Sequence, residues 1–134
     1  MKQSEDNAEW VNFRRTHLCS SDAPKVMEGR DADLLSLWEE KQGFEREFFL
    51  TEAMAHGKAL EPIAREFFNH HVKDVFLPTV RESRIVPWMG ASLDGVNLSE
   101  TALLEIKCPY SSNLLVETKQ GNVPDRYYFQ MLHT

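Results

Sequence analysis

Long apolar runs and cysteines are scarce in this sequence. No apolar stretch approaches the ~18 residues that a helix needs to cross a bilayer, and residues 1–7 carry no apolar signal core. The two cysteines, Cys19 and Cys108, are too few for a disulfide framework or a four-cysteine metal cluster. We therefore expect no membrane-spanning segment and a reducing, cytoplasmic compartment.

Internal repeats, Pro/Gly/Ser-rich linkers and an excess of basic charge are also lacking. A chain of 134 residues is long enough for one core but not for two, so we expect a single domain over residues 1–134. The formal net charge of −6 argues against a protein that coats nucleic acid non-specifically. A DNA enzyme is still allowed, because carboxylates that hold divalent cations make a chain acidic while a local basic cluster contacts DNA.

The N-terminal third is predicted to be helical. Apolar residues at helical spacing predict a first helix over about residues 5–15 and another over 33–42. Between them, Ser20 or Ser21 is expected to cap a short helix that has Pro24 near its start.

Two stretches show the i, i+3, i+4 spacing of a helix face that is buried. Leu34, Leu37 and Trp38 form such a stripe in the helix over residues 33–42. The longest helix is predicted over about residues 51–71. Its expected buried face comprises Leu60, Ile63, Ala64, Phe67 and Phe68.

The residue pattern changes its period after the longest helix. Residues 79–86, 89–95 and 102–108 are short stretches bounded by Pro, Gly, Asn and Ser, which predicts three strands in an antiparallel meander. A last helix is predicted over residues 125–133. The order of helices, three strands and a helix indicates an α+β fold with helices packed on a sheet.

Asp94 and the sequence Glu105-Ile106-Lys107 carry the most specific chemical signal. Residues two apart in a strand share a face, so Glu105 and Lys107 point the same way while Ile106 points into the core. If the strand of Asp94 is the neighbour, two carboxylates and a backbone carbonyl make a site suited to magnesium or manganese. Such a metal polarises a phosphoryl oxygen and activates water, and a lysine orients that water or stabilises negative charge. The combination is typical of phosphodiester hydrolysis.

Each half of this pattern also has a plainer interpretation. An Asp before a Gly at a strand end is usually a turn residue, and a Glu-x-Lys face is usually solvated surface. The two halves occur in order on consecutive predicted strands, after a helix that carries its own glutamate, Glu61, and this favours the metal site. A metal-binding structural domain without DNA chemistry stays open as an alternative.

The motifs resemble those of one nuclease family. Asp94 followed by residues 105–107 looks like the D…(D/E)xK signature of the PD-(D/E)xK nuclease superfamily. Residues 57–65 are similar to the G-x-x-x-E-x-x-A-R helix motif of the lambda exonuclease and YqaJ-like viral recombinase family, and residues 104–109 resemble its L-E-(I/L)-K-C-P strand. Two further resemblances, in family order, are the W-x-x-x-R…S-D element at residues 10–22 and the Y-Y-x-Q element at residues 127–130.

This resemblance implies a restriction-endonuclease-like core, in which a central mixed sheet with a three-strand antiparallel meander is flanked by helices. It also implies a site for Mg²⁺ or Mn²⁺, with two ions. Asp94 and Glu105 would be metal ligands together with the backbone carbonyl of Ile106. Glu61 would reach the second metal or its water from the neighbouring helix.

The remaining implied roles concern water and DNA. Lys107 would position or activate the attacking water, and Gln130 would orient that water or the scissile phosphate. A guanidinium and serine hydroxyls suit a pocket for a terminal phosphate dianion. The residues at family positions that hold a 5′-terminal phosphate are Arg14, Ser21 and Ser92, with Arg30 within one residue of another such position.

The function that the resemblance implies is a 5′→3′ exonuclease of phage-type recombination, acting on free ends of double-stranded DNA beside a single-strand annealing protein. Relatives form rings of three, so a homotrimer is expected, in the cytoplasm of a bacterial or phage-infected host cell. An endonuclease of the same superfamily and a non-catalytic remnant that binds DNA or a partner are the alternatives. The sequence departs from the family pattern at two points. Leu132 stands where the family usually has a second glutamine. The family core also continues beyond the helix in which this chain ends, so we expect the domain to be incomplete at its C-terminus.

Overall fold

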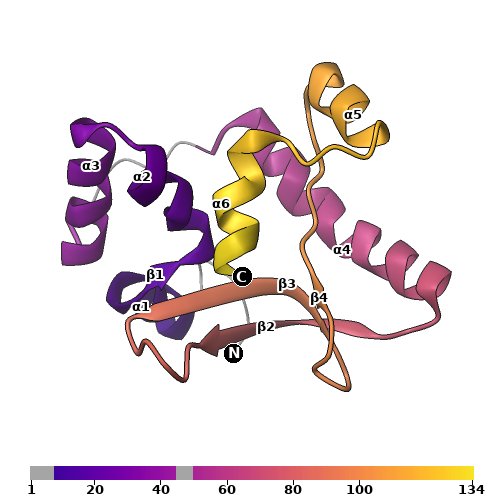
Figure 1. Ribbon diagram of the computed structural model, residues 1–134, viewed down its shortest axis with the longest axis horizontal. Helices are drawn as coiled ribbons and strands as arrows, with labels where there is room; N and C mark the ends of the chain where they lie inside the picture. Colours follow the sequence, from indigo (N-terminus) through magenta and orange to yellow (C-terminus); the bar gives the residue numbers. More distant parts are fainter. Residues whose placement is uncertain (1–7, 45–49) are drawn as a thin grey trace. The chain divides into compact units, whose positions relative to one another are not determined.

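Figure 1 shows a computed structural model of the protein, which describes residues 8–44 and 50–134. The described residues form two compact units that interleave along the chain. Unit 1 is drawn from Met1–Glu47, Pro78–Leu93 and Asp125–Thr134, and unit 2 from Phe48–Leu77 and Asp94–Pro124. No helix in the described ranges combines the length and the apolar character that a membrane span requires.

Unit 1 is mainly helical. Its helices α2 and α6 pack together, as do α1 and α3. Gly43 ends α3 in the left-handed conformation, with φ of 79°, as a glycine after a helix commonly does. The elements that lie wholly in unit 1 are α1 (Ala8–Thr16), β1 (Leu18–Cys19), the 3-10 helix η1 (Ser20–Asp22), α2 (Ala23–Glu28), α3 (Asp31–Gln42) and α6 (Asp125–His133).

The sheet is mixed and has β3 (Met89–Asn97) at its centre, in the order β1-β3-β2 with β4 (Leu103–Leu104) also paired to β3. The first residues of β3 pair in parallel with β1, with Leu18 opposite Met89. The last residues of β3 pair antiparallel with β4, with Gly95 opposite Leu104. β2 spans Phe76–Glu82. The chain therefore has the predicted α+β composition, with a sheet whose central strand begins in unit 1 and ends in unit 2.

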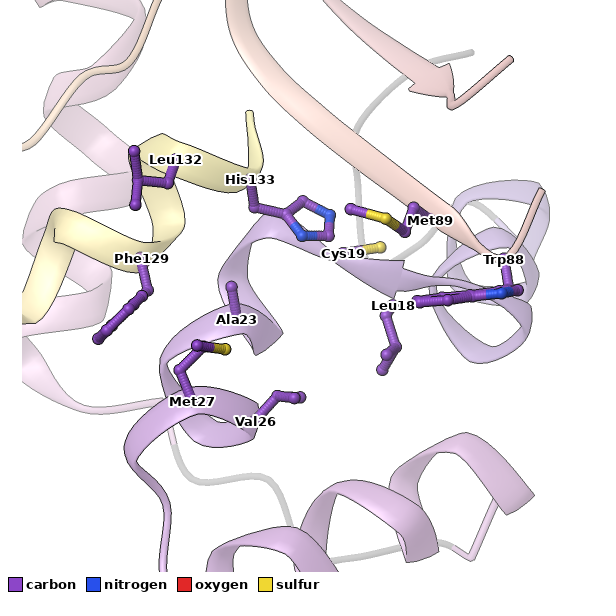
Figure 2. Close-up of a pocket in the computed structure, with 10 residues that line it drawn as sticks. All are labelled: Leu18, Cys19, Ala23, Val26, Met27, Trp88, Met89, Phe129, Leu132 and His133. Atoms are coloured by element: carbon purple, nitrogen blue, oxygen red, sulfur yellow. The ribbon is translucent and has the colours of Figure 1, made fainter. Parts of the chain in front are cut away.

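An apolar pocket of about 370 Å³ lies in unit 1 (Figure 2). Its walls come from β1, α2, the start of β3 and α6. The lining residues are Leu18, Cys19, Ala23, Val26, Met27, Trp88, Met89, Phe129, Leu132 and His133. None of the residues predicted to act in catalysis or phosphate binding lines this pocket, and its apolar walls offer little to an anion.

Unit 2 is organised by the long helix α4 (Glu52–Val72), which Thr51 caps by accepting a hydrogen bond from Met54 N–H at 3.2 Å. Asn69 on α4 makes two hydrogen bonds to the backbone of Phe76, one donated and one accepted, at 3.1 and 3.0 Å. Asn97 closes the turn between β3 and β4 by accepting from the N–H groups of Thr101 and Ala102, both at 2.9 Å. These amides hold the helix and the strand ends in register.

The buried face of α4 differs from the prediction. Ile63 is 61% exposed and Phe67 is 73% exposed, and Leu60 is exposed as well. The half-buried stripe comprises Glu61, Ala64, Arg65, Phe68 and Asn69. The helix is therefore rotated by about one residue from the hydrophobic prediction, because polar groups on the inner face, such as Asn69, bind the backbone of the strands.

Other expectations on local structure need correction. The stripe predicted for α3 is only partly buried, since Leu37 is buried but Leu34 and Trp38 are exposed. Neither Ser20 nor Ser21 caps the helix after β1; the carboxylate of Asp22 accepts the N–H of Cys19 instead, at 2.9 Å. Helix α5 (Ser112–Lys119) was not anticipated.

The predicted strand over residues 102–108 is present only as β4. Beyond Leu104, the backbone N–H of Ile106 donates to the Asp94 side chain at 2.7 Å. A side chain of β3 therefore takes the place of a strand-to-strand hydrogen bond, and regular pairing stops at the point where the predicted metal site begins.

Candidate active site

Helix α4 brings Glu61 and Arg65 to the inner side of unit 2. They lie one turn apart, and the Glu61 Oε1 atom is 3.3 Å from Arg65 Nη2. The other nitrogen of the guanidinium, Nη1, donates a 2.7 Å hydrogen bond to the backbone carbonyl of Asp94. Arg65 is 13% exposed, so this contact between the helix and β3 is well shielded from water.

Asp94 occupies the fourth position from the end of the nine-residue strand β3, and Gly95 follows it. A side chain at Gly95 would have its Cβ 2.8 Å from the Cβ of Phe76 and 3.2 Å from that of Leu104. The missing side chain thus lets the neighbouring segments approach closely beside Asp94. Its carboxylate is oriented by the 2.7 Å hydrogen bond that Ile106 N–H donates to Oδ2.

Glu105 and Lys107 lie directly after β4 and on the same side of the chain. Lys107 Nζ is 2.6 Å from Glu105 Oε1, and the other oxygen, Oε2, is buried. The Glu105 side chain is 11% exposed and that of Lys107 33%. Tyr110, three residues further on, donates a 3.0 Å hydrogen bond to Glu52 on α4 and thereby anchors this segment to the helix.

The three carboxylates share one electrostatic environment. Burial is the main cause that raises the pKa of Glu61, and the negative charges of Asp94 and Glu105 raise it further. Burial also raises the pKa of Asp94 and that of Glu105, against the opposing charge of Lys107. Carboxylates that are desolvated and repel one another destabilise the charged form, and a divalent cation between them would relieve this cost.

The donor set of this cluster fits a hard divalent cation, since it offers carboxylate and backbone oxygens. Among residues 8–44 and 50–134, no three acidic, cysteine or histidine side chains stand close enough to hold one ion together. The reason is visible in the contacts. Glu61 is turned to Arg65, Asp94 to Ile106 N–H and Glu105 to Lys107. The chemistry of the donor set fits a metal, and in this structure each carboxylate is held by a partner of its own.

A second group of predicted residues lies together in unit 1. Arg14 Nη1 donates a 3.0 Å hydrogen bond to Ser21 Oγ, and its guanidinium carbon lies 5.2 Å from the centre of the Trp10 ring. The indole N–H of Trp10 donates to Ser92 Oγ at 3.0 Å. Trp10 therefore links Ser92 on β3 to Arg14 and Ser21, and we call Trp10, Arg14, Ser21 and Ser92 the Arg14 cluster.

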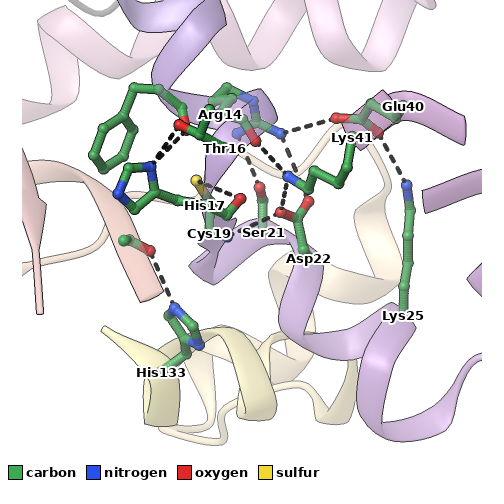
Figure 3. Close-up of polar contacts among 12 residues, drawn as sticks. Arg14, Thr16, His17, Cys19, Ser21, Asp22, Lys25, Glu40, Lys41 and His133 are labelled. Atoms are coloured by element: carbon green, nitrogen blue, oxygen red, sulfur yellow. Dashed lines mark hydrogen bonds and ion pairs between the residues drawn. The ribbon is translucent and has the colours of Figure 1, made fainter. Parts of the chain in front are cut away.

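Charged residues also lie close to Arg14 (Figure 3). Asp22 is 2% exposed, and its Oδ1 atom is 3.8 Å from Arg14 Nη2. Lys41 on α3 contacts Asp22 Oδ2 and the backbone carbonyl of Arg14, both at 2.6 Å. Glu40 lies 3.8 Å from Arg14 and 3.8 Å from Lys25.

Two predicted site residues stand apart from these groups. Arg30 is an exposed residue before α3, where its guanidinium pairs with Asp33 at 3.6 Å and its N–H donates to the same carboxylate. The structure does not bring Arg30 into the Arg14 cluster through these contacts. Gln130 lies half-buried on α6 in unit 1. Its role toward water or phosphate stays a prediction.

Several residues that contact the predicted site residues were not given a role from the sequence, among them Trp10, Asp22, Lys41 and Arg65. Trp10 and Arg65 do occur in the matched motifs, at the i, i+4 spacing from Arg14 and Glu61 that allows side-chain contact on a helix. Asp22 follows Ser21 in such a motif but has an equally plain interpretation as a turn residue. Nothing in the sequence distinguishes Lys41 from other lysines, because its partners are 19 and 27 residues away.

Comparisons with known proteins give a consistent result. The sequence matches the YqaJ-like viral recombinase domain over residues 9–134. The crystal structure of LHK-Exo in complex with dAMP is similar with a TM-score of 0.80 and 25% identity, covering 96% of this chain and 67% of that one. A crystal structure of LHK-Exo, an alkaline exonuclease from Laribacter hongkongensis, has a TM-score of 0.77 and 25% identity, covering 92% of this chain and 64% of that one.

This chain thus spans about two thirds of the length of these solved structures. Comparison with curated protein sequences gives no match. The expected α+β, restriction-endonuclease-like fold with a mixed sheet flanked by helices is confirmed by the likeness to the exonuclease structures. Since the family match extends over nearly the whole sequence, the chain belongs to the YqaJ-like viral recombinase domain family.

Proposed function

We propose that the protein is a divalent-metal-dependent nuclease that degrades double-stranded DNA from a 5′-phosphorylated end. The observation that carries the proposal is the cluster of Glu61, Asp94, Glu105 and Lys107, three desolvated carboxylates with one ammonium in unit 2. Membership of the family and the likeness to an alkaline exonuclease support the same reaction.

In this proposal Asp94, Glu105 and the Ile106 carbonyl hold Mg²⁺ or Mn²⁺, and Glu61 holds a second ion or its water. The bound metal supplies Lewis-acid polarisation of the phosphoryl oxygen and a more acidic water. Lys107 holds the attacking water and stabilises the negative charge that develops on the phosphate. Ion-pairing to Glu105 keeps the Lys107 ammonium in this position before substrate arrives.

Arg65 supports the cluster without contacting the substrate. Its guanidinium binds both Glu61 and the backbone of Asp94, so it fixes the spacing between α4 and the end of β3. Because it carries a positive charge, it also lowers the pKa of both carboxyls against the effect of burial. The carboxylates are thus kept available as metal ligands.

The Arg14 cluster in unit 1 is proposed to bind the 5′-terminal phosphate. The Arg14 guanidinium contacts the Ser21 hydroxyl, and Trp10 connects it to the Ser92 hydroxyl. A guanidinium gives charge-assisted hydrogen bonds to a dianion, and serine hydroxyls can add further hydrogen bonds. Arg14 is 23% exposed, so it is open to a ligand while being held by Ser21. We further expect the homotrimer and the single-strand annealing partner that the family resemblance implies, and a cytoplasmic location.

The decisive assay compares a linear 5′-phosphorylated duplex with a covalently closed circle, each with Mg²⁺ and with a chelator. We expect degradation of the linear DNA in Mg²⁺ only. Lys107→Ala should abolish it, whereas Lys119→Ala, which removes an exposed lysine on α5, should not. Cleavage of closed circles would favour an endonuclease, and DNA binding without cleavage by the folded, metal-loaded protein would favour the non-catalytic alternative.

A further inference from the structure

The environment of Arg14 contains a carboxylate that would compete with a phosphate for the same guanidinium. Asp22 is almost completely buried, and its Oδ1 atom lies 3.8 Å from Arg14 Nη2. In a shielded environment such a pair attracts strongly, because there is little water to screen the two charges. A free Asp22 carboxylate would therefore neutralise the charge on which anion binding at Arg14 depends.

Lys41 lies where it counteracts this competition. Its Nζ atom is 2.6 Å from Asp22 Oδ2, whereas Arg14 Nη2 is 3.8 Å from Asp22 Oδ1. Lys41 also donates to the backbone carbonyl of Arg14, so the ammonium is fixed by the chain segment that carries the guanidinium. Its side chain is 13% exposed, and water screens the pair little.

We propose that Lys41 is a positioning residue for substrate binding, which neutralises Asp22 and so leaves the charge of Arg14 available to a 5′-terminal phosphate. The inference rests on the proposed phosphate-binding role of the Arg14 cluster. The shielded group of Arg14, Lys41 and Asp22 has two positive charges and one negative. The more exposed pair of Lys25 and Glu40 adds no net charge, so one positive charge is left for the phosphate. Without Lys41 the same group would be neutral.

Asp22 has a separate structural task that explains why a carboxylate is present. Its Oδ2 atom accepts the N–H of Cys19 at 2.9 Å and so holds β1 against η1. An asparagine keeps an oxygen for this hydrogen bond but carries no charge. Asp22→Asn therefore separates the structural contact from the competition for Arg14.

Lys25 provides a matched control for Lys41. It also pairs with a carboxylate close to Arg14, namely Glu40, and both side chains of that pair are 42% exposed. Water and salt screen an exposed pair of this kind, so its removal changes the field at Arg14 little. Lys25→Met and Lys41→Met thus remove the same charge and leave the same side chain, and they differ mainly in burial.

The test measures equilibrium binding of two blunt duplexes that differ only in a 5′-phosphate or a 5′-hydroxyl, by fluorescence anisotropy of the full chain in chelator. We expect the wild type to prefer the phosphorylated duplex by about tenfold or more, as for a charge-assisted contact. Lys41→Met should reduce the ratio to about one to threefold. Lys41→Met combined with Asp22→Asn should restore most of it, and Lys25→Met should keep the wild-type ratio.

Rescue by the double variant is the result that a purely structural role of Lys41 does not produce. Each variant is checked by circular dichroism. If Lys41→Met does not fold, the single variant Asp22→Asn tests the proposal. Its preference for the 5′-phosphorylated duplex should then equal or exceed that of the wild type. A folded Lys41→Met with an unchanged ratio, or a folded Asp22→Asn or double variant with a lost ratio, overturns the proposal. Equal binding of both duplexes by the wild type would instead overturn the phosphate-binding role of Arg14 itself.

Discussion

Arg65 on α4 donates a 2.7 Å hydrogen bond to the backbone carbonyl of Asp94, so the helix is attached to β3 at the residue proposed to bind metal. The same guanidinium contacts Glu61 at 3.3 Å. The relative position of two carboxylates from different elements therefore depends on one side chain. This makes Arg65 the residue through which the geometry of the site can be perturbed without the removal of a ligand.

Arg65→Ala is expected to lower nuclease activity by about tenfold to a hundredfold, since a charge-assisted hydrogen bond contributes about 1.5–3 kcal/mol. The loss should be accompanied by a lower melting temperature, because the partly buried backbone carbonyl of Asp94 loses a donor. Rates on linear duplex and thermal melts measure the two effects. Arg84→Ala, at an exposed position after β2, serves as the control, and equal effects of both substitutions would contradict the role of Arg65.

Lys107→Ala is expected to change activity and metal affinity in opposite directions. Activity should vanish, because the ammonium that we propose to hold the attacking water is gone. Affinity for Mg²⁺ or Mn²⁺ should rise, because Lys107 no longer occupies Glu105 Oε1 at 2.6 Å. Isothermal titration calorimetry on the apo protein measures the affinity. Weaker metal binding by the folded variant would show that Lys107 supports the metal site and does not compete with it.

Metal affinity should fall as the pH is lowered, starting at higher pH than for ordinary carboxylates. The reason is that burial raises the pKa of Glu61, Asp94 and Glu105, so protons compete with the metal sooner. An acid whose pKa is raised by folding stabilises the fold in its protonated form. That contribution is present at low pH and is lost as the pH rises through the raised pKa.

Metal should therefore raise the melting temperature more at pH 8 than at pH 5.5. Melting curves with and without Mg²⁺ across this range test the expectation. Asp94→Asn removes one of the repelling charges but keeps an oxygen for the N–H of Ile106. The apo variant should be at least as stable as the wild type at pH 8 and should gain little from Mg²⁺. An unchanged Mg²⁺ effect in this variant would place the metal elsewhere.

Two glycines in unit 2 should respond in opposite ways to alanine. At Gly95 the new Cβ would lie 2.8 Å from the Cβ of Phe76, so Gly95→Ala should destabilise the protein by about 1–3 kcal/mol. At Gly57 on α4 nothing lies within 4 Å of a new Cβ, and alanine there should stabilise the helix by about 0.5–1 kcal/mol. Urea denaturation measures both. Equal stability of the two variants would contradict the close approach at Gly95.

The sequence by itself determined the elements whose signals are local. Helix α6 begins and ends at the residues predicted from the pattern, and Gly43 ends α3 as expected. The spacing of Glu105 and Lys107 also sufficed to place both side chains on the same side. In each case the physical cause is a short-range rule, such as a helix period, a left-handed terminus or the alternation along an extended chain.

Tertiary structure alone decided which side of α4 faces the sheet. Hydrophobicity favoured the stripe of Leu60, Ile63 and Phe67, but these residues are exposed, and the inner stripe includes Glu61 and Arg65. Burial of charged side chains is favourable only where partners are present, and the Asp94 carbonyl that Arg65 contacts on β3 is 29 residues away in the sequence. No local pattern contains that information.

The pairing of Lys41 with Asp22 depends on tertiary structure for the same reason. Lys41 is one of several lysines in an acidic chain, and its contacts with Asp22 and with the backbone of Arg14 exist only once α3 has packed against α1. The sequence therefore determined the chemical groups of the site and most of the elements that carry them. The packing decided which charges lie next to the groups that we propose to bind metal and phosphate.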